Sequence, residues 1–139
     1  MQNQKDRIII DTNLWISFLI TKDFTKLDSI IKNKKVTLVF SQELLDEFMA
    51  VSQRKKIKKY FELDDLRNLI LAIKQQAIFV NVTSKETICR DAKDNFLLSL
   101  AKDSKATHLI TGDKDLLILE NYNATKIINI TTYFQLNKI

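Results

Sequence analysis

The chain of 139 residues contains no proline, one glycine, one cysteine and one histidine. Because flexible linkers are usually rich in proline and glycine, we expect a single domain over the whole chain. The lone Cys89 cannot form an internal disulfide, which fits a reducing cytoplasm, and a small buried hydrophobic residue is its simplest interpretation. One histidine and one cysteine exclude a structural zinc site, so any bound metal must be held by oxygen ligands.

Long apolar runs are missing as well. No run approaches the roughly 20 residues that cross a bilayer, and the polar start Met1–Arg7 lacks the pattern of a signal peptide. These features predict a cytoplasmic protein with no membrane contact. Lysine and arginine total 22 against 17 aspartate and glutamate, a formal net charge of +5. This moderate excess favours a polyanionic partner, although a composition rich in Lys, Ile and Asn also follows from genome bias.

Periodicity predicts strands that alternate with helices along the chain. Short apolar runs predict strands at Arg7–Ile10, Lys35–Phe40, Ala77–Val82, His108–Thr111 and Lys126–Ile130. Helices are predicted at Thr12–Thr21, Phe24–Asn33, Gln42–Gln53, Asp65–Gln76, Asn95–Lys105, Lys114–Leu119 and Thr131–Lys138, with a basic helical segment at Arg54–Phe61. Ser41 and Asp64 are the expected N-caps of the helices that follow them. Such alternation predicts the α/β class, with a mainly parallel sheet covered on both faces.

Two of the predicted strands run directly into an aspartate. Ile8–Ile10 leads into Asp11, and Leu109-Ile110 leads through Thr111 and Gly112 into Asp113. Because ligands bind beyond the carboxyl ends of parallel strands, the two carboxylates are expected to converge there. Each aspartate alone is also an ordinary helix N-cap. Gly112, the only glycine, is expected to allow a tight turn with positive φ.

A third acid precedes the predicted helix Asn95–Lys105. Asp94 is interpreted as the N-cap of this helix or as a metal ligand, and Asp91, three residues earlier, competes for the same role. The fourth acid lies on the helix Gln42–Gln53. There Glu47 borders the apolar stripe, whereas Glu43 lies farther from it. A carboxylate beside a buried face needs compensating positive charge, which favours Glu47 as a ligand.

Carboxylates gathered in this way repel one another unless a cation lies between them. A hard dication such as Mg²⁺ or Mn²⁺ is the natural partner of oxygen ligands, and it leaves positions open for phosphate oxygens and water. The predicted site therefore suits hydrolysis of a phosphodiester bond.

These segments, taken in order, resemble the acidic motifs of PIN-domain nucleases. The matching stretches are Ile9-Ile10-Asp11-Thr12-Asn13, Ser41 to Glu47, Asp91 to Asn95, and His108 to Leu117. Together the resemblance spans about Ile8 to Leu119, most of the chain. It is greatest to the bacterial and archaeal members that act as toxins of toxin–antitoxin pairs.

The resemblance implies a three-layer α/β/α sandwich that cleaves single-stranded RNA with Mg²⁺ or Mn²⁺ and leaves 5′-phosphate and 3′-hydroxyl ends. Carried over residue by residue, the catalytic and metal-binding acids are Asp11, Glu47, Asp94 and Asp113. The supporting residues are Asn13, Thr111, Asp115 and, as the alternative to Asp94, Asp91. The resemblance also implies a homodimer and a cognate antitoxin that blocks the acidic pocket with a basic side chain.

Basic residues near the acids are candidates for RNA contact, because an acidic site repels phosphate on its own. They are Arg54, Lys55, Lys56, Lys58 and Lys59, followed by Arg90 and Lys93 beside the third acid. A solvated helical face is the simpler interpretation of the first group. Tyr60 and Phe61 either stack on bases or pack in the protein, whereas Trp15 is expected in the core or at an interface and His108 in a structural role.

Three other functions fit the same residues less well. A PIN-type nuclease that processes RNA without acting as a toxin differs only in its biological role. A magnesium-dependent phosphatase is disfavoured, because Asn13 stands where a second aspartate would serve as general acid. A non-catalytic module that binds RNA or protein would keep the fold without needing the acids.

Overall fold

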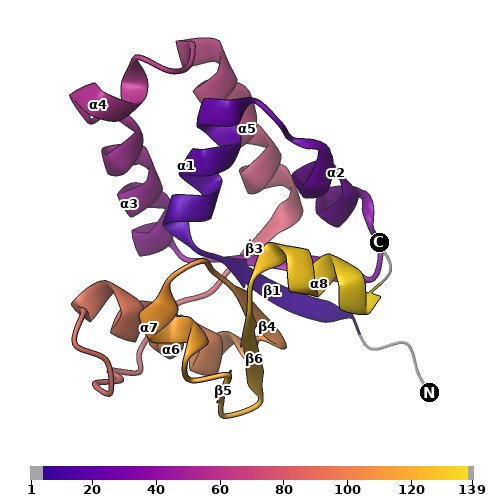
Figure 1. Cartoon of the computed structure of the whole chain (residues 1–139), viewed down its shortest axis with the longest axis vertical. Coiled ribbons are helices and arrows are strands. Elements are labelled where there is room, and N and C mark those ends of the chain that lie inside the picture. The colour runs from indigo at the N-terminus through magenta and orange to yellow at the C-terminus, as the bar shows by residue number, and fades with distance from the viewer. Residues whose placement is uncertain (1–4, 138–139) are drawn as a thin grey trace.

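The computed structural model describes residues 5–137 and, within them, a six-stranded sheet with helices on both sides (Figure 1). The strands are β1 (Asp6–Ile10), β2 (Val36–Phe40), β3 (Ala77–Phe79), β4 (His108–Ile110), β5 (Asn121–Tyr122) and β6 (Thr125–Ile128). Their order is β3-β2-β1-β4-β6-β5, and every pair is parallel except β5 with β6. The predicted mainly parallel sheet is confirmed.

The helices form the two outer layers. They are α1 (Thr12–Thr21), α2 (Thr25–Lys32), α3 (Gln42–Ser52), α4 (Lys55–Lys58), α5 (Leu63–Gln76), α6 (Ala92–Ser104), α7 (Lys114–Leu117) and α8 (Ile130–Asn137). Figure 1 shows α1, α2, α3 and α5 gathered above the sheet and α6 and α7 below it. The protein is therefore a three-layer α/β/α sandwich, as the resemblance implied. Among residues 5–137, no helix combines the length and the apolar character that a membrane crossing requires.

The core explains why the first strand ends where it does. Ile8, Ile9 and Ile10 are fully buried, as expected for a central parallel strand covered on both faces. Trp15 is also fully buried, its indole Nε1 donates a hydrogen bond to the carbonyl of Ile10 at 3.0 Å, and its ring packs against Phe40. Trp15 thus belongs to the core, as predicted, and fixes the turn from β1 into α1.

The strand order reverses between β1 and β4. From β1 the chain proceeds outward through β2 to β3, and it then returns to β4 on the other side of β1. The backbone pairing continues one residue past each strand, because the N–H of Asp11 donates to the carbonyl of Ile110 and that of Thr111 to the carbonyl of Ile128, both at 3.0 Å. In open α/β sheets, ligands bind at the carboxyl ends of the strands where the order reverses. Asp11 and Thr111 lie at this point.

Most predicted elements agree with the structure to within two residues, and four features differ. The predicted strand Ala77–Val82 ends at Phe79, and β5 was not predicted because two residues leave no periodic signal. The predicted N-cap Asp64 is wrong: α5 begins at Leu63, and Glu62 is its N-cap in a capping box with Asp65. The helix predicted from Asn95 begins at Ala92 instead.

Two local expectations are also wrong. Gly112 does not have a positive φ, and a Cβ atom built on it would meet no atom within 4 Å, so neither a left-handed turn nor crowding requires glycine there. The basic segment Arg54–Phe61 is helical only over Lys55–Lys58. Met1 to Gln4 of the polar start and Lys138 of the last predicted helix lie outside the described residues.

Candidate active site

The two strand ends are joined by a short chain of hydrogen bonds. Asp11 is the N-cap of α1 and Asp113 is the N-cap of α7, so the N-cap interpretation holds for both. Asp11 Oδ1 accepts from the backbone N–H of Asn13 at 3.4 Å, and its Oδ2 accepts from Thr111 Oγ1 at 2.7 Å. Thr111 Oγ1 accepts in turn from the backbone N–H of Asp113 at 3.0 Å. Thr111 therefore orients the carboxylate of Asp11 and holds the backbone at Asp113, whereas Asn13 contributes its backbone and has an exposed side chain.

Three carboxylates meet beside this series of hydrogen bonds. Asp94, Asp113 and Asp115 each offer an oxygen, and these oxygens lie within 4.8 Å of one another. Asp94 is 5% exposed and comes from the first turn of α6. Burial, followed by the charge of Asp113 and a hydrogen bond with it, raises the pKa of Asp94 to about 7. Carboxylates this close are tolerated only when a proton or a cation reduces their repulsion.

Asp11 interacts with the same cluster although it is not one of these three residues. It is 8% exposed, and burial is the main cause that raises its pKa, opposed by the hydrogen bond from Thr111. The charges of Asp113 and Glu47 raise its pKa further. The charge of Asp113 acts on both Asp11 and Asp94, so the acids predicted from two strand ends and one helix do gather at one site.

The structure separates Asp91 from Asp94. Asp91 is the exposed N-cap of α6 and accepts from the backbone N–H of Lys93 at 2.8 Å. Asp94 is buried and belongs to the close cluster. The expected N-cap role thus falls to Asp91, and the geometry favours Asp94 as the third acid of the site.

Glu47 reaches the site from α3. Its Oε2 accepts a hydrogen bond from Thr12 Oγ1 at 2.7 Å, and its Oε1 lies 3.7 Å from Lys93 Nζ. Thr12 is buried and was not among the predicted site residues. It follows Asp11 directly, but its partner lies 35 residues further along the chain, and only the fold could reveal that contact.

The donor set suits a hard dication. Within residues 5–137, no lysine or arginine forms an ion pair with Asp11, Asp94 or Asp113. The two neighbouring cations pair at the rim instead, Lys93 with Glu47 and Arg90 with Asp115 at 3.2 Å. The inner acids therefore have no cation of the protein to reduce their repulsion, and their oxygens are the ligands that Mg²⁺ and Mn²⁺ prefer.

The basic segment lies at the far end of α3. Arg54 follows Glu47 by seven residues, which is about 10 Å along a helix axis. The five cations of this segment are exposed, and none of them has an ion pair in the part of the chain that the structure describes. Tyr60 is exposed with Lys59 Nζ 5.2 Å from its ring centroid, whereas Phe61 packs against the core.

Cys89 and His108 lie outside the reactive cluster. Burial, with a smaller contribution from Asp94, raises the pKa of the half-buried Cys89 thiol, which disfavours a reactive thiolate. His108 begins β4, at the opposite end from the acids, where its ring contacts Tyr133 edge-on and its Nδ1 lies 2.8 Å from Thr107 Oγ1. These contacts agree with the structural role expected for His108.

The fold and the acidic cluster together define an α/β protein with a carboxylate site, suited to a dication, at the switch point of its sheet. Residues 7–115 match the PIN domain family, and the chain belongs to this family. The uncharacterized protein MJ1680 of Methanocaldococcus jannaschii is 31% identical over 132 residues, which cover 93% of this chain and 84% of that protein. PIN domains are generally metal-dependent nucleases, and the acidic cluster fits that activity.

Proposed function

We propose that this protein is an endoribonuclease that uses Mg²⁺ or Mn²⁺ to hydrolyse phosphodiester bonds in single-stranded or structured RNA. One observation carries the proposal. The buried carboxylate of Asp94 lies within 4.8 Å of oxygens of Asp113 and Asp115, and no cation of residues 5–137 pairs with Asp94 or Asp113. A divalent cation would relieve the repulsion within such a cluster at neutral pH and allow all of its carboxylates to ionise.

In this proposal Asp11, Asp94 and Asp113 hold the metal, and Glu47 completes the site directly or through water. When bound, the metal lowers the pKa of water and neutralises charge that develops on the leaving oxygen. Asp115 lies close enough to orient the ligands from outside, and Thr111 holds Asp11 in position.

The charge distribution supports a polyanionic substrate. The inner acids would repel RNA without a nearby basic surface, and the unpaired cations of the basic segment provide one on the same helix layer. The net charge of +5 acts in the same direction. The preference for RNA over DNA rests on the family resemblance.

The test is cleavage of RNA by the purified protein with Mg²⁺, with Mn²⁺ and with a chelator, followed by sequencing of the cut ends. Asp11→Asn should lower the cleavage rate at least about a hundredfold. The fold should survive, because asparagine is as good an N-cap as aspartate. Asp64→Asn is the matched control, since its side chain is 83% exposed and its one ion pair within residues 5–137 is with Arg67, and it should cleave like the wild type.

Each alternative has a distinct outcome in this experiment. Hydrolysis of a small phosphate ester without cleavage of RNA would contradict the proposal in favour of a phosphatase. RNA binding that is equal in the wild type and Asp11→Asn, with no cut ends, would indicate a binding module.

We further propose that the protein acts in the cytoplasm as the toxin of a toxin–antitoxin pair and forms a homodimer. The resemblance to toxin members of the family supports this proposal. Expression of the chain in a bacterial host should arrest growth, Asp11→Asn should not, and the product of an adjacent short reading frame should restore growth. Harmless expression combined with cleavage of one precursor RNA would favour a processing role. Sedimentation equilibrium decides the oligomeric state.

A further inference from the structure

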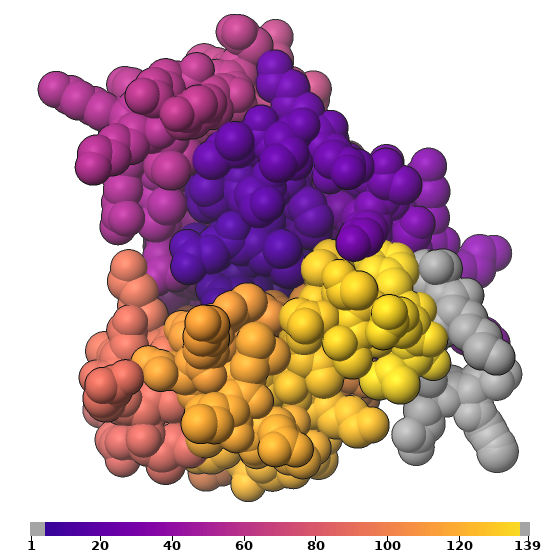
Figure 2. Space-filling model, in the orientation of Figure 1, coloured from indigo at the N-terminus to yellow at the C-terminus, as the bar shows by residue number. Residues whose placement is uncertain are grey.

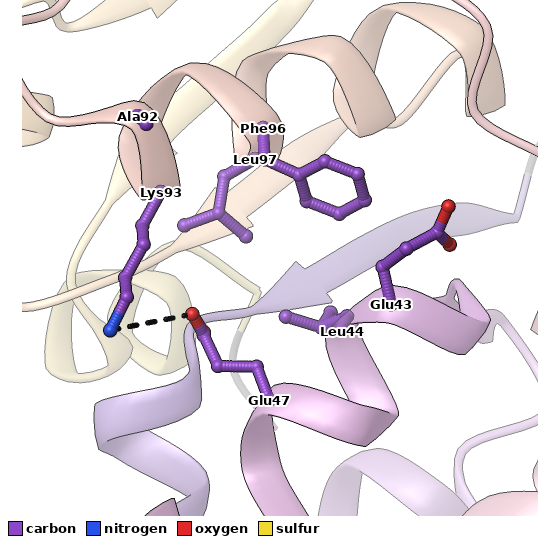
Figure 3. A pocket seen from close by; sticks show the side chains of 7 residues that line it. All are labelled: Glu43, Leu44, Glu47, Ala92, Lys93, Phe96 and Leu97. Carbon is purple, nitrogen blue, oxygen red and sulfur yellow. Dashed lines mark ion pairs between the residues drawn. The ribbon is translucent and has the colours of Figure 1, made fainter. Parts of the chain in front are cut away.

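A cavity of about 220 Å³ lies between α3 and α6 beside the acidic site (Figure 3). Its lining residues are Glu43, Leu44, Glu47, Ala92, Lys93, Phe96 and Leu97. Glu47 belongs to both places, because it lines the cavity and its charge also acts on Asp11. In Figure 2 the surface is indented at the left, between its magenta and salmon parts, on the side where α3 and α6 face each other. A group held in this cavity would therefore adjoin whatever the acids bind.

The cavity has an apolar middle and two polar ends. Leu44, Leu97 and the ring of Phe96 form the middle, as Figure 3 shows. The ion pair of Lys93 with Glu47 lies at one end, and the carboxylate of Glu43 lies at the other. Within residues 5–137, Glu43 forms no ion pair, so its oxygens remain available as hydrogen-bond acceptors.

This layout matches one part of an RNA chain. A nucleobase has apolar faces that stack on aromatic rings and an edge that forms hydrogen bonds, and proteins read single-stranded RNA by holding such splayed bases. A phosphate group does not match the far end of the cavity, because Glu43 would repel it. At the near end, the cation of Lys93 favours the phosphate that is attached to the base.

We propose that this cavity binds an unpaired base of the RNA next to the scissile phosphate, with the base against Phe96 and its edge toward Glu43. The inference rests on the proposed nuclease function and adds a determinant of where the RNA is cut. A carboxylate only accepts hydrogen bonds. Guanine offers two adjacent N–H donors on its Watson–Crick edge, whereas the single N3–H of uracil lies between two carbonyl oxygens. The cavity should therefore prefer guanine to uracil.

Binding of uncut RNA is the direct test, made in the Asp11→Asn background with Mg²⁺ present. The probes are an octamer of uridines, the same octamer with one central guanosine, and the same octamer with one central abasic nucleotide. The guanosine probe should bind roughly tenfold more tightly than the other two. Glu43→Gln, whose amide presents a donor as well as an acceptor, should reduce this ratio to about twofold or less, and Phe96→Leu should reduce it as well.

Asp46→Asn is the matched control, because this acid lies on the same helix, is exposed and does not line the cavity. It should keep the tenfold ratio. Phe96 is partly buried against the core, so its variant also tests packing; Glu43 is exposed, and its variant separates base binding from folding. A guanosine ratio that is unchanged in Glu43→Gln and Phe96→Leu would overturn the inference.

Cleavage separates this inference from the proposed function. In a pool of random single-stranded RNA, the wild type and Asp46→Asn should cut beside guanine, and the cuts that Glu43→Gln still makes should show no such preference. Efficient cleavage by the wild type without a preferred flanking base would overturn the inference and leave the nuclease proposal intact. If the wild type cuts no RNA, the nuclease proposal fails, and a guanosine ratio abolished in Glu43→Gln would still support the base site. If an arginine peptide occupies the cavity and RNA binding is unchanged in Glu43→Gln and Phe96→Leu, the cavity binds a protein partner and the inference is overturned.

Discussion

At the level of single residues, threonine hydroxyls orient two of the acids, and one of these, Glu47, also has the cation of Lys93 as a partner. Thr111 donates to Asp11 at 2.7 Å, and Thr12 donates to Glu47 at the same distance. A neutral hydroxyl fixes the direction of a carboxylate without cancelling its charge. A lysine or arginine in its place would fix the direction and also cancel the charge. Thr111 therefore leaves the charge of Asp11 for an ion, whereas Glu47 shares its charge with Lys93.

The buried carboxyl of Asp94 should make the metal-free protein less stable as pH rises. Its pKa is about 7 in the folded chain against 3.8 for the free side chain. The protonated form therefore contributes stability that is fully present below pH 3.8 and is lost as pH rises through 7. With chelator present, Asp94→Asn should raise the free energy of unfolding by on the order of 2 kcal/mol at pH 8, and by little at pH 4.

Urea unfolding between these two pH values measures the effect, and Asp64→Asn serves as the control because that side chain is exposed. Adding Mg²⁺ at pH 8 should stabilise the wild type and leave Asp94→Asn unchanged, since the ion binds the folded state through this cluster. Parallel pH curves for the wild type and Asp94→Asn would show that Asp94 carries no such penalty.

At the level of elements, the cap of α3 determines where one acid of the site and one acid of the neighbouring cavity lie. Ser41 is fully buried, and its Oγ accepts a hydrogen bond from the backbone N–H of Leu44 at 3.0 Å, as the sequence predicted. Because Glu43 and Glu47 follow on this helix, its first turn positions both of them. The cap thus links the end of β2 to the active site and to the neighbouring cavity.

Ser41→Ala should lower the free energy of unfolding by about 1 kcal/mol, because it removes the cap and leaves a helix N–H without its partner. Ser29→Ala is the control: this half-buried serine of α2 donates only to the carbonyl of Thr25 one turn earlier, and alanine is the better helix former, so stability should change little. Chemical denaturation compares the two variants. If both substitutions had the same effect, the cap would contribute nothing to α3.

Local signals explain which elements were predicted correctly. Buried strands such as β1 and capped helices such as α3 have both an apolar pattern and a start residue, and both appear where they were expected. The start of α6 was wrong because Asp91 and Asp94 each satisfy the N-cap pattern, and only tertiary packing buries one of them. A two-residue strand such as β5 is formed by its pairing with β6 and has no pattern of its own.

The site was predictable only in part for the same reason. Asp11 and Asp113 follow strands, so the geometry of a parallel sheet brings them to one edge, and this could be inferred before the structure. The contact of Thr12 with Glu47 and the ion pair of Lys93 with Glu47 join segments that are distant in the chain. No periodicity records such contacts, and the cavity between α3 and α6 has no sequence signal for the same reason.

At the level of the whole molecule, opposite charges are separated along one layer. The acids lie at the carboxyl edge of the sheet, whereas exposed lysines lie both at the far end of α3 and beside the amino end of β2. Only the first group directly follows α3, the helix that carries Glu47. If RNA contacts the basic segment directly, removing the first group of lysines must weaken RNA binding more than removing the second, although both changes remove the same charge.

Replacing Lys55, Lys56 and Lys58 with glutamine should weaken RNA binding and reduce its salt dependence. For single strands the slope of log K against log salt changes by about 0.7 for each phosphate that the protein no longer neutralises, so up to about 2 is expected here. The control replaces Lys32, Lys34 and Lys35, which are exposed beside the amino end of β2, and removes the same charge. Binding of an uncut oligonucleotide to both triple variants in the Asp11→Asn background, from about 50 to 200 mM salt, measures the slopes. Because both variants carry the same net charge, equal slopes would mean that the overall field alone attracts RNA and that the basic segment does not touch it.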